Sequence, residues 1–289
     1  MSSINGIRFI IGTACNYNCF YCHHEGCTDD YHDNCDLSEY ERKVELLYEF
    51  CIKEGIYEIA ITGGEPFFYP ERLCILLKYF ADERLHCVIN TNASLVKRHI
   101  DFIEGLSCSL EFHVNLSSLS PLIHRRITRS ESLFDEMESL ELLAATKHVV
   151  KLNVICLKSI NDDLLVGIHK YAMSKRFVPR YLVLYDKAGA NKELVMDVDG
   201  ICGVFNAVVY QRFGYGIYMA KGDYDIEIVK CLCDDMECET CKRNTFLHLD
   251  PDLDIKYCQS LDDVVRVDYD SLESVAGCFN EACLRLSEL

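Results

Sequence analysis

Three cysteines stand close together near the start of the chain, in the segment Cys15-Asn-Tyr-Asn-Cys19-Phe-Tyr-Cys22. Thiolates at this C-x3-C-x2-C spacing on one loop are able to hold three irons of a four-iron cluster and to leave the fourth iron open for another ligand. A structural zinc site is the alternative, because zinc takes four protein ligands and residues 23–27 add two histidines and a cysteine. The spacing favours the iron–sulfur cluster over zinc.

A second motif lies further along the chain, at Thr62-Gly-Gly-Glu-Pro66. Its glycines allow a backbone to approach a ligand closely, and the carboxylate of Glu65 is able to accept hydrogen bonds from a cation. Taken alone, the same residues also suit an ordinary turn before a helix. The two motifs together are more distinctive than either one, because each follows a short apolar segment typical of a strand.

Short apolar segments rich in β-branched residues alternate with amphipathic segments through the first two-thirds of the chain. The apolar segments predict strands at residues 7–12, 57–62, 86–91, 110–116, 149–157 and 180–185. Apolar residues at helical spacing predict helices at residues 37–54, 70–82, 95–106, 133–146 and 162–174. This alternation implies parallel strands joined by right-handed helical crossovers.

Six such units are too few for a closed eight-stranded barrel, so the sequence predicts an α/β fold built as a partial (βα)6 TIM-type barrel with an open side. In folds of this kind the chemistry gathers at the C-terminal edge of the sheet. We expect the barrel over residues 1–191 and a connecting segment with a turn at 214–216 over residues 192–230. Residues 231–289 form a cysteine-rich C-terminal region in which the last element is a helix.

Polar residues on the predicted strands mark the inside of the barrel. Alternation along the strand at 110–116 places His113, Asn115 and Ser117 on one side, either as part of a substrate pocket or as ordinary polar packing. Lys151 lies on the next predicted strand. An inward lysine is costly unless it meets an anion, so we expect it to face the substrate; on an edge strand it would instead reach solvent.

The composition limits the class of protein. Apolar residues make up 49% of the 289 residues and charged residues 26%, which suffices for a sizeable core and excludes a disordered chain. The net charge of −17 is unsuited to gripping nucleic acid phosphates. No segment has the run of about 18 apolar residues that a membrane helix needs, and no signal peptide precedes the first strand. We therefore expect a cytoplasmic protein without nucleic acid or membrane partners.

The chain contains 18 cysteines and no tryptophan. In the reducing cytoplasm an excess of cysteine indicates metal ligation or thiol chemistry rather than disulfides. A second ligand set with the spacing C-x2-C-x16-C consists of Cys238, Cys241 and Cys258. It suits either an iron–sulfur cluster or a zinc knuckle. The candidates for a fourth ligand are Cys231, Cys233 and, for zinc alone, His248.

The first cysteine motif followed by Gly-Gly-Glu-Pro resembles the radical S-adenosylmethionine (SAM) superfamily. The resemblance implies a [4Fe-4S] cluster on Cys15, Cys19 and Cys22 whose open iron is chelated by SAM. Members of the family reduce SAM with one electron, cleave it to methionine and a 5′-deoxyadenosyl radical, and use the radical to abstract a hydrogen atom. The SAM-contacting positions that the resemblance implies are Tyr21, Gly63, Gly64, Glu65, Asn115 and Tyr185.

Beyond these motifs the chain is most similar to the GTP 3′,8-cyclase (MoaA) branch of that superfamily. The similarity lies in residues 114–121, 151–153, 158–163 and 180–191, whose order and spacing match those of the branch. It implies a second, auxiliary [4Fe-4S] cluster on the C-terminal cysteines, with a free iron facing the substrate. The substrate-contacting positions that the similarity implies are Thr91, Lys151 and Arg243.

Departures from the branch bear on the substrate. Ala14, Ala60 and Thr245 stand where GTP cyclases place arginines, and only Arg243 of that set is retained. An arginine fork is the natural partner of a triphosphate, so the sequence argues against GTP. We expect a nucleotide or nucleoside-like small molecule that undergoes cyclisation, rearrangement or carbon–carbon bond formation. The expected partner is a low-potential electron donor such as flavodoxin or ferredoxin.

Two other functions stay open. One is a radical SAM maturase that modifies peptides, which we favour less because only about six residues precede the first predicted strand and leave no room there for a peptide-recognition domain. The other belongs to a different class: a zinc-binding structural or interaction protein that uses both cysteine sets.

Overall fold

A computed structural model of the chain describes residues 4–22, 36–186, 189–231, 233, 239, 242, 245–258, 261 and 263–289. Within these residues eleven strands form one sheet in the order β11-β10-β1-β2-β3-β4-β5-β6-β9-β8-β7. The first six along the chain are β1 (Gly6–Ile10), β2 (Glu58–Thr62), β3 (His86–Thr91), β4 (Glu111–Asn115), β5 (Val149–Cys156) and β6 (Val178–Val183). The others are β7 (Val208–Phe213), β8 (Ile217–Lys221), β9 (Asp225–Val229), β10 (Phe246–Leu249) and β11 (Ile255–Lys256).

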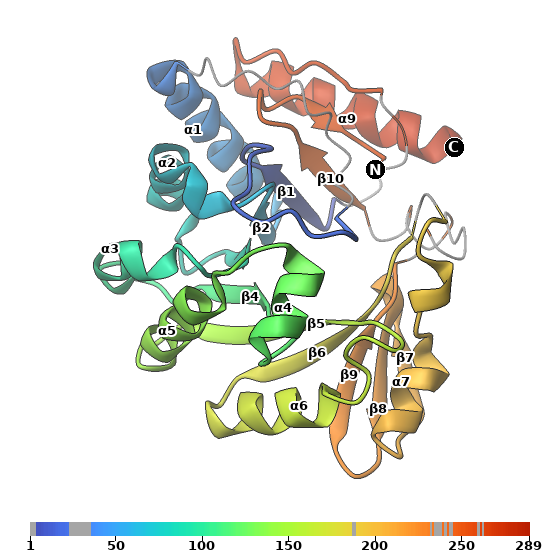
Figure 1. The fold of residues 1–289 in the computed structure, drawn as a ribbon. Coiled ribbons are helices and arrows are strands. Elements are labelled where there is room, and N and C mark those ends of the chain that lie inside the picture. Colours follow the sequence, from blue (N-terminus) through green and yellow to red (C-terminus); the bar gives the residue numbers. More distant parts are fainter. Residues whose placement is uncertain are drawn as a thin grey trace.

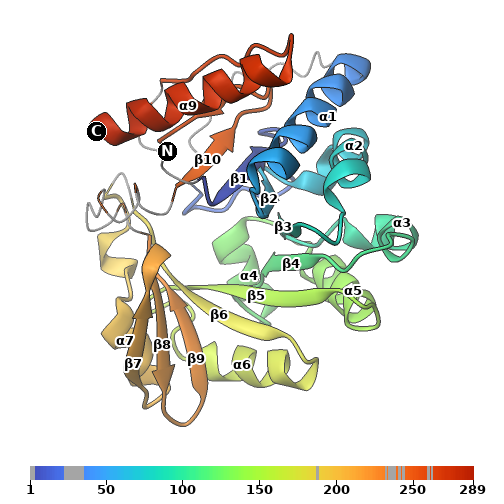
Figure 2. The same cartoon turned by 180° about the vertical axis from the view of Figure 1, so that it is seen from behind.

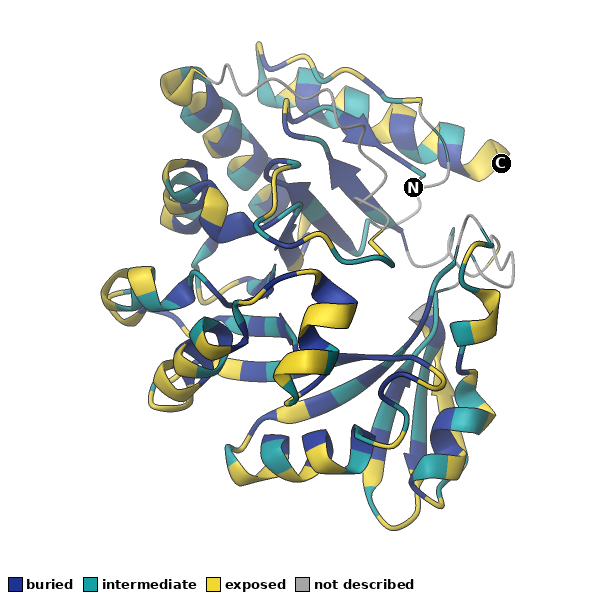
Figure 3. Ribbon diagram, viewed as in Figure 1, coloured by how far each residue is buried: buried dark blue, intermediate teal, exposed yellow. Residues whose placement is uncertain are grey.

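Strands β1 to β6 pair in parallel, as the predicted crossovers require. The helices that join them are α1 (Leu37–Glu54), α2 (Pro70–Phe80), α3 (Ile100–Glu104), α4 (Pro121–Thr128), α5 (Leu133–Ala144) and α6 (Leu165–Ser174). Figures 1 and 2 show α1, α2, α3, α5 and α6 around the outside of a curved sheet, and Figure 3 shows the buried side of these helices turned toward it. The sheet is not closed, because β11 and β7 are its two ends. The prediction of a partial α/β barrel is confirmed.

Helix α1 shows how local sequence fixes the bounds of an element. The Asp36 side chain accepts hydrogen bonds from the backbone N–H groups of Ser38 and Glu39, which have no partner within the helix. Gly55 ends the helix in the left-handed conformation, at φ 69°. The observed bounds of α1 and of β3 coincide with the predicted ones.

One predicted element is wrong. Instead of a single helix over residues 95–106, the chain forms the 3-10 turn η3 (Val96–His99) and then the short helix α3, which ends before Gly105. His99, at φ −123° and ψ 11°, departs from helical geometry and separates the two. Other short elements are η2 (Pro66–Phe68), η4 (Lys192–Leu194), α7 (Val198–Val204) and η5 (Gly214–Gly216).

The sequence did not predict α4 or the strands β7 to β9. Strand β7 lies at the edge of the sheet and is exposed on both faces, so it lacks the alternation of apolar and polar residues that marks a strand. The expected turn at residues 214–216 is present as η5, between β7 and β8. The antiparallel strands β7 and β8 extend the sheet through β9, which pairs in parallel with β6.

The C-terminal part of the chain returns to the N-terminal part. Strand β10 pairs in parallel with β1, and α9 (Leu272–Glu288) packs against α1. The rings of Phe50 in α1 and Phe279 in α9 lie 4.5 Å apart between centroids. The predicted final helix is therefore present. Among the described residues, no helix is both long and apolar enough to cross a membrane.

Candidate active site

The cysteine loop, residues 11–22, follows β1 at the C-terminal edge of the sheet. Its backbone is held by the last turn of α4: the N–H of Asn18 donates to the carbonyl of Thr128 at 3.0 Å, and that of Phe20 to the carbonyl of Ile127 at 3.3 Å. A tight turn closes between Cys22 and Cys19, with an N–H to carbonyl distance of 3.1 Å. The middle of the loop is therefore held by α4, and its end is held by this turn.

The three thiols of this loop lie near one another. Burial, together with a smaller effect of neighbouring cysteines, raises the pKa of Cys15 to about 11 and that of Cys19 to about 12. Cys15 Sγ accepts hydrogen bonds from the Tyr17 N–H at 3.3 Å and from Asn92 Nδ2 at 3.8 Å. Cys15 and Cys19 are therefore neutral thiols at pH 7 unless a bound cation displaces their protons.

The donor set suits a cluster better than a single ion. In the part of the chain that the structure describes, no three His, Cys, Asp or Glu side chains converge as they would around one metal ion. The N–H···S hydrogen bonds to Cys15 are the kind that tune an iron–sulfur cluster. A structural zinc site would require the thiols to close around the ion.

The Gly-Gly-Glu-Pro loop after β2 lies directly against the cysteine loop. The N–H of Gly64 donates to the carbonyl of Gly12 at 2.8 Å, and that of Glu65 donates to the carbonyl of Ala14 at 3.0 Å. A Cβ on Gly64 would lie only 2.1 Å from the Ala14 oxygen, and Gly63 has a φ of +136°. In this structure the glycines therefore allow two backbones to meet, where the sequence suggested close approach to a ligand.

Glu65 is buried at the same place. Its Oε1 accepts hydrogen bonds from Phe67 N–H at 3.1 Å and Thr91 Oγ1 at 2.6 Å, and its Oε2 accepts one from Asn92 N–H at 2.8 Å. Burial raises the pKa of Glu65 to about 7, although these hydrogen bonds lower it. Thr91 thus lies with the Gly-Gly-Glu-Pro loop, and its hydroxyl is bound to Glu65.

Two further predicted residues meet across the opening of the barrel. Asn115, at the end of β4, donates a side-chain hydrogen bond to the hydroxyl of Tyr21 in the cysteine loop. Ser117 lies 3.2 Å from Asn115 Oδ1, so these two residues share one side as the alternation predicts. Tyr185 follows β6 and is half-buried.

The inner face of the sheet carries Lys151 next to a carboxylate. Lys151 Nζ lies 2.9 Å from Glu111 Oε1, and His113 Nε2 lies 2.5 Å from the same oxygen. The register of β4 and β5 puts His113 opposite Lys151. Burial would raise the pKa of Glu111, but the hydrogen bonds of His113, His86 and Lys151 hold it well below its usual range.

A second ion pair continues this inner face. Arg180 Nε on β6 lies 2.6 Å from Glu227 Oε1 on β9, and Arg180 Nη1 lies 3.2 Å from His113 Nδ1. The register aligns Asn115, Asn153, Arg180 and Glu227 in one row across four strands. Lys151 and Arg180 are therefore already partnered by carboxylates.

Sequence reasoning missed several of these residues. Glu111 and Glu227 were not singled out, although alternation along β4 places Glu111 on the side of His113. Glu227 lies in a segment that was not predicted as a strand. Asn92, which bonds to Cys15 and caps the loop after β3, had no signal in the sequence.

Part of the predicted second cluster lies outside the described residues, namely Cys238, Cys241 and Arg243. Cys258, which follows β11, is described and is half-buried. Cys231 and Cys233 are also half-buried, near the end of β9. The 14 cysteines that the structure describes are all free of disulfide bonds.

A sequence profile of the Radical SAM superfamily matches residues 9–172, a segment that runs from β1 to α6 and contains both loops of the site. The chain belongs to the radical SAM superfamily. Two relatives are GTP 3′,8-cyclases: that of Helicobacter pylori (strain ATCC 700392 / 26695) is 26% identical over 250 residues, covering 83% of this chain and 76% of that protein. The GTP 3′,8-cyclase of Campylobacter jejuni subsp. jejuni serotype O:6 is 30% identical over 196 residues, which cover 66% of this chain and 59% of that protein.

Solved structures of this superfamily have the same fold. SuiB of Streptococcus suis superposes with a TM-score of 0.68 at 12% identity, over 95% of this chain and 66% of that one. The protein anSMEcpe, solved with bound AdoMet, superposes with a TM-score of 0.63 at 13% identity, over 97% of this chain and 79% of that one. At such identities the likeness concerns the fold alone. The resemblance to the MoaA-like branch rests on the cyclases and is confirmed by them.

Proposed function

We propose that this radical SAM enzyme cleaves SAM reductively at a [4Fe-4S] cluster held by Cys15, Cys19 and Cys22. The observation that carries the proposal is the pairing of the cysteine loop with the Gly-Gly-Glu-Pro loop through two backbone hydrogen bonds. This pairing brings the cluster ligands and the SAM motif of the superfamily into one place. When bound, the cluster and SAM supply the electron and the 5′-deoxyadenosyl radical.

The chain's own residues would bind and orient SAM. The positions assigned to this role are Tyr21, Gly63, Gly64, Glu65, Asn115 and Tyr185. Asn115 and Tyr21 support the assignment because they meet over the C-terminal edge of the sheet, next to the cysteine loop. Glu65, held by three hydrogen bonds, fixes the loops after β2 and β3 relative to each other.

The substrate is a small polar molecule of nucleoside-like type, without a triphosphate. Lys151 and Arg180 are two cations of the inner face on neighbouring strands, and each is neutralised by a carboxylate within 2.9 Å. A triphosphate bound to these two cations would have to displace Glu111 and Glu227 or lie beside them, which like charges oppose. Amide and imidazole groups such as Asn153 and His113 suit uncharged hydrogen-bonding partners. Hydrogen abstraction then leads to cyclisation, rearrangement or carbon–carbon bond formation.

A second [4Fe-4S] cluster on Cys238, Cys241 and Cys258 belongs to the proposal, with Arg243 beside it on the substrate side. The relatives named GTP 3′,8-cyclase and the cysteine spacing support it. Either the free iron of this cluster faces the substrate, or Cys231 or Cys233 closes the cluster as a fourth ligand. The electron comes from a low-potential donor such as flavodoxin or ferredoxin, in the cytoplasm, where the free thiols would remain reduced.

A peptide substrate is the second candidate. The fold is shared with anSMEcpe, of which one structure contains AdoMet and a peptide, and β7 offers an exposed edge strand for backbone pairing. The two candidates are separated by supplying nucleosides or short peptides in deuterated form and by following label transfer into 5′-deoxyadenosine.

Anaerobic reconstitution with iron and sulfide tests the proposed function. The wild type should become brown, bind about eight irons per chain if both clusters assemble, and form 5′-deoxyadenosine from SAM under strong reductant. Cys19→Ala should abolish this cleavage, whereas Cys241→Ala should retain uncoupled cleavage. Colourless protein with stoichiometric zinc and no SAM cleavage would refute the proposed enzymatic function. Complete loss of SAM cleavage in both variants would refute separate roles for the two clusters.

A further inference from the structure

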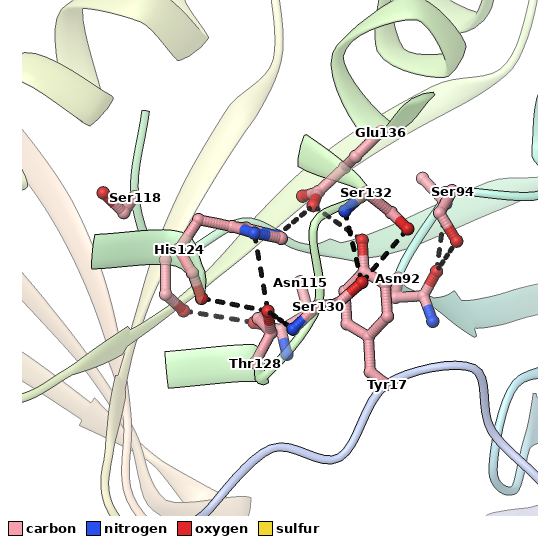
Figure 4. Close-up of polar contacts among 12 residues, drawn as sticks. Tyr17, Asn92, Ser94, Asn115, Ser118, His124, Thr128, Ser130, Ser132 and Glu136 are labelled. Carbon is pink, nitrogen blue, oxygen red and sulfur yellow. Dashed lines mark hydrogen bonds and ion pairs between the residues drawn. The ribbon is translucent and has the colours of Figure 1, made fainter. Parts of the chain in front are cut away.

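Three buried polar side chains lie directly behind the cysteine loop, as Figure 4 shows. The Tyr17 hydroxyl donates a hydrogen bond of 3.3 Å to Glu136 Oε2, and His124 Nε2 lies 3.1 Å from the same oxygen. The rings of Tyr17 and His124 meet edge to face, with 5.6 Å between their centroids. None of the three is more than 7% exposed. We call Tyr17, His124 and Glu136 the buried triad.

The buried triad is joined to the cysteine loop through side chain and backbone alike. Tyr17 stands between Cys15 and Cys19 in the chain, and its own N–H donates to Cys15 Sγ at 3.3 Å. The helix that carries His124 ends at Thr128, whose carbonyl accepts the N–H of Asn18. Tyr17 therefore connects the triad to a point in the chain that is two positions from both Cys15 and Cys19.

Glu136 is the acidic member of the buried triad. Its side chain is fully buried, and its Oε1 has no hydrogen-bond partner within the described residues. Burial raises the pKa of Glu136 to about 7, although the hydrogen bonds from His124 and Tyr17 lower it. The other ionisable groups coupled to it are the carboxyl of Glu65 and the phenol of Tyr171. Apart from His124, none of these partners offers a positive charge.

We propose that the buried triad couples electron uptake at the cysteine loop to proton uptake at Glu136. This inference rests on the proposed function, in which Cys15, Cys19 and Cys22 hold the cluster that is reduced. One electron passes from the low-potential donor to the cluster, and one proton passes from solvent to the Glu136 carboxylate, so the charge of the region is unchanged. Buried charges act strongly on each other because little water screens them.

The test compares reconstituted wild type with Glu136→Gln, which keeps the shape of the side chain and one acceptor oxygen but cannot ionise. The midpoint potential of the cluster is measured by EPR-monitored redox titration at several pH values on either side of about 7. In the wild type it should fall as the pH rises through this range. In Glu136→Gln the fall should be smaller, because of the two buried carboxyls, Glu65 and Glu136, only Glu65 still ionises near pH 7. Above pH 7 the potential should be less negative than in the wild type, because a nearby negative charge has been removed.

Glu141→Gln is the matched control, since Glu141 lies on the same helix but is exposed and paired with Lys175 at 2.6 Å. It should keep the wild-type dependence on pH. A wild type without pH dependence, or a Glu136→Gln variant with the wild-type dependence, would overturn the inference. Iron content is measured on every sample, so a wild type that assembles no cluster counts against the proposed function.

Tyr17→Phe provides an independent test if Glu136→Gln does not assemble its cluster. It leaves Glu136 ionisable but removes a hydrogen bond that favours the carboxylate. The pH range over which the potential falls should therefore move upward. An unchanged range would show that Tyr17 does not connect Glu136 to the loop, and the inference would fail.

Discussion

Two carboxylates of the site differ in charge because their partners differ. Glu65 accepts its hydrogen bonds from uncharged donors, and burial raises its pKa to about 7. Burial acts on Glu111 in the same direction, but the hydrogen bonds of His113, His86 and Lys151 prevail and keep its pKa far below the usual range. Glu111 therefore stays ionised at neutral pH and neutralises Lys151.

Glu111→Gln should lower the free energy of unfolding by about 2 kcal/mol at pH 7, because it leaves a half-buried Lys151 without its anion. The pKa of Glu111 is lower in the folded than in the unfolded chain, so its stabilisation is complete above the unfolded value of 4.5. It is lost as the pH falls toward the folded value. Urea unfolding of wild type and variant at pH 7 and at about pH 3 measures this difference.

The exposed pair of Glu141 and Lys175 serves as the control for this prediction. Removing it with Glu141→Gln should change the free energy of unfolding by no more than about 0.5 kcal/mol, since both side chains remain in contact with water. Equal losses in the two variants at pH 7 would contradict the special environment of Glu111.

At the scale of elements, the site depends on two loops that touch. The loops after β1 and β2 lie side by side because their strands pair in parallel, with Ile10 opposite Thr62. Their backbones then meet at Gly12 and Gly64. Parallel pairing therefore places the two motifs together, and glycine lets them come within hydrogen-bonding distance.

Gly64→Ala should lower the free energy of unfolding by about 2 kcal/mol and reduce the iron bound on reconstitution. The added Cβ would stand 2.1 Å from the Ala14 oxygen, so the cysteine loop must move. Gly167→Ala in α6 is the control, because its Cβ would meet no atom within 4 Å and alanine favours a helix. Thermal unfolding and iron analysis measure both. A Gly64→Ala variant with wild-type stability and iron content would show that the loops do not need this contact.

At the scale of the whole molecule, the C-terminal region completes the N-terminal side of the sheet. Strand β10 covers the edge of β1, and α9 packs its buried residues, Val275, Phe279, Ala282 and Leu286, toward α1 and β11. The cysteine loop follows β1 directly. The stability of that loop therefore depends on residues more than two hundred positions away.

Phe279→Ala should lower the free energy of unfolding by about 3–5 kcal/mol, because Phe279 is 1% exposed and its ring packs on that of Phe50. Leu284→Ala on the same helix is the control: Leu284 is 64% exposed, and the loss should stay below about 0.5 kcal/mol. Urea unfolding of both variants measures the difference. Similar losses would mean that α9 does not pack on α1 as described.

Much of the barrel was predictable from the sequence because its elements carry their own signals. Strands β1 to β6 each have a buried, apolar face, and helices such as α1 begin and end at capping residues. The cysteine and Gly-Gly-Glu-Pro motifs are each contained in a single loop. Edge strand β7 and the short helix α4 were missed, because the first has no apolar face and the second spans only eight residues.

The sequence by itself determined which residues are able to do chemistry and, through parallel pairing, that the two motif loops lie at one edge of the sheet. Only the tertiary structure decided their partners. Tyr17 meets Glu136 across 119 positions, and Lys151 meets Glu111 across the register of two strands. Such pairs have no fixed spacing, because they depend on how helices and strands pack after each has formed.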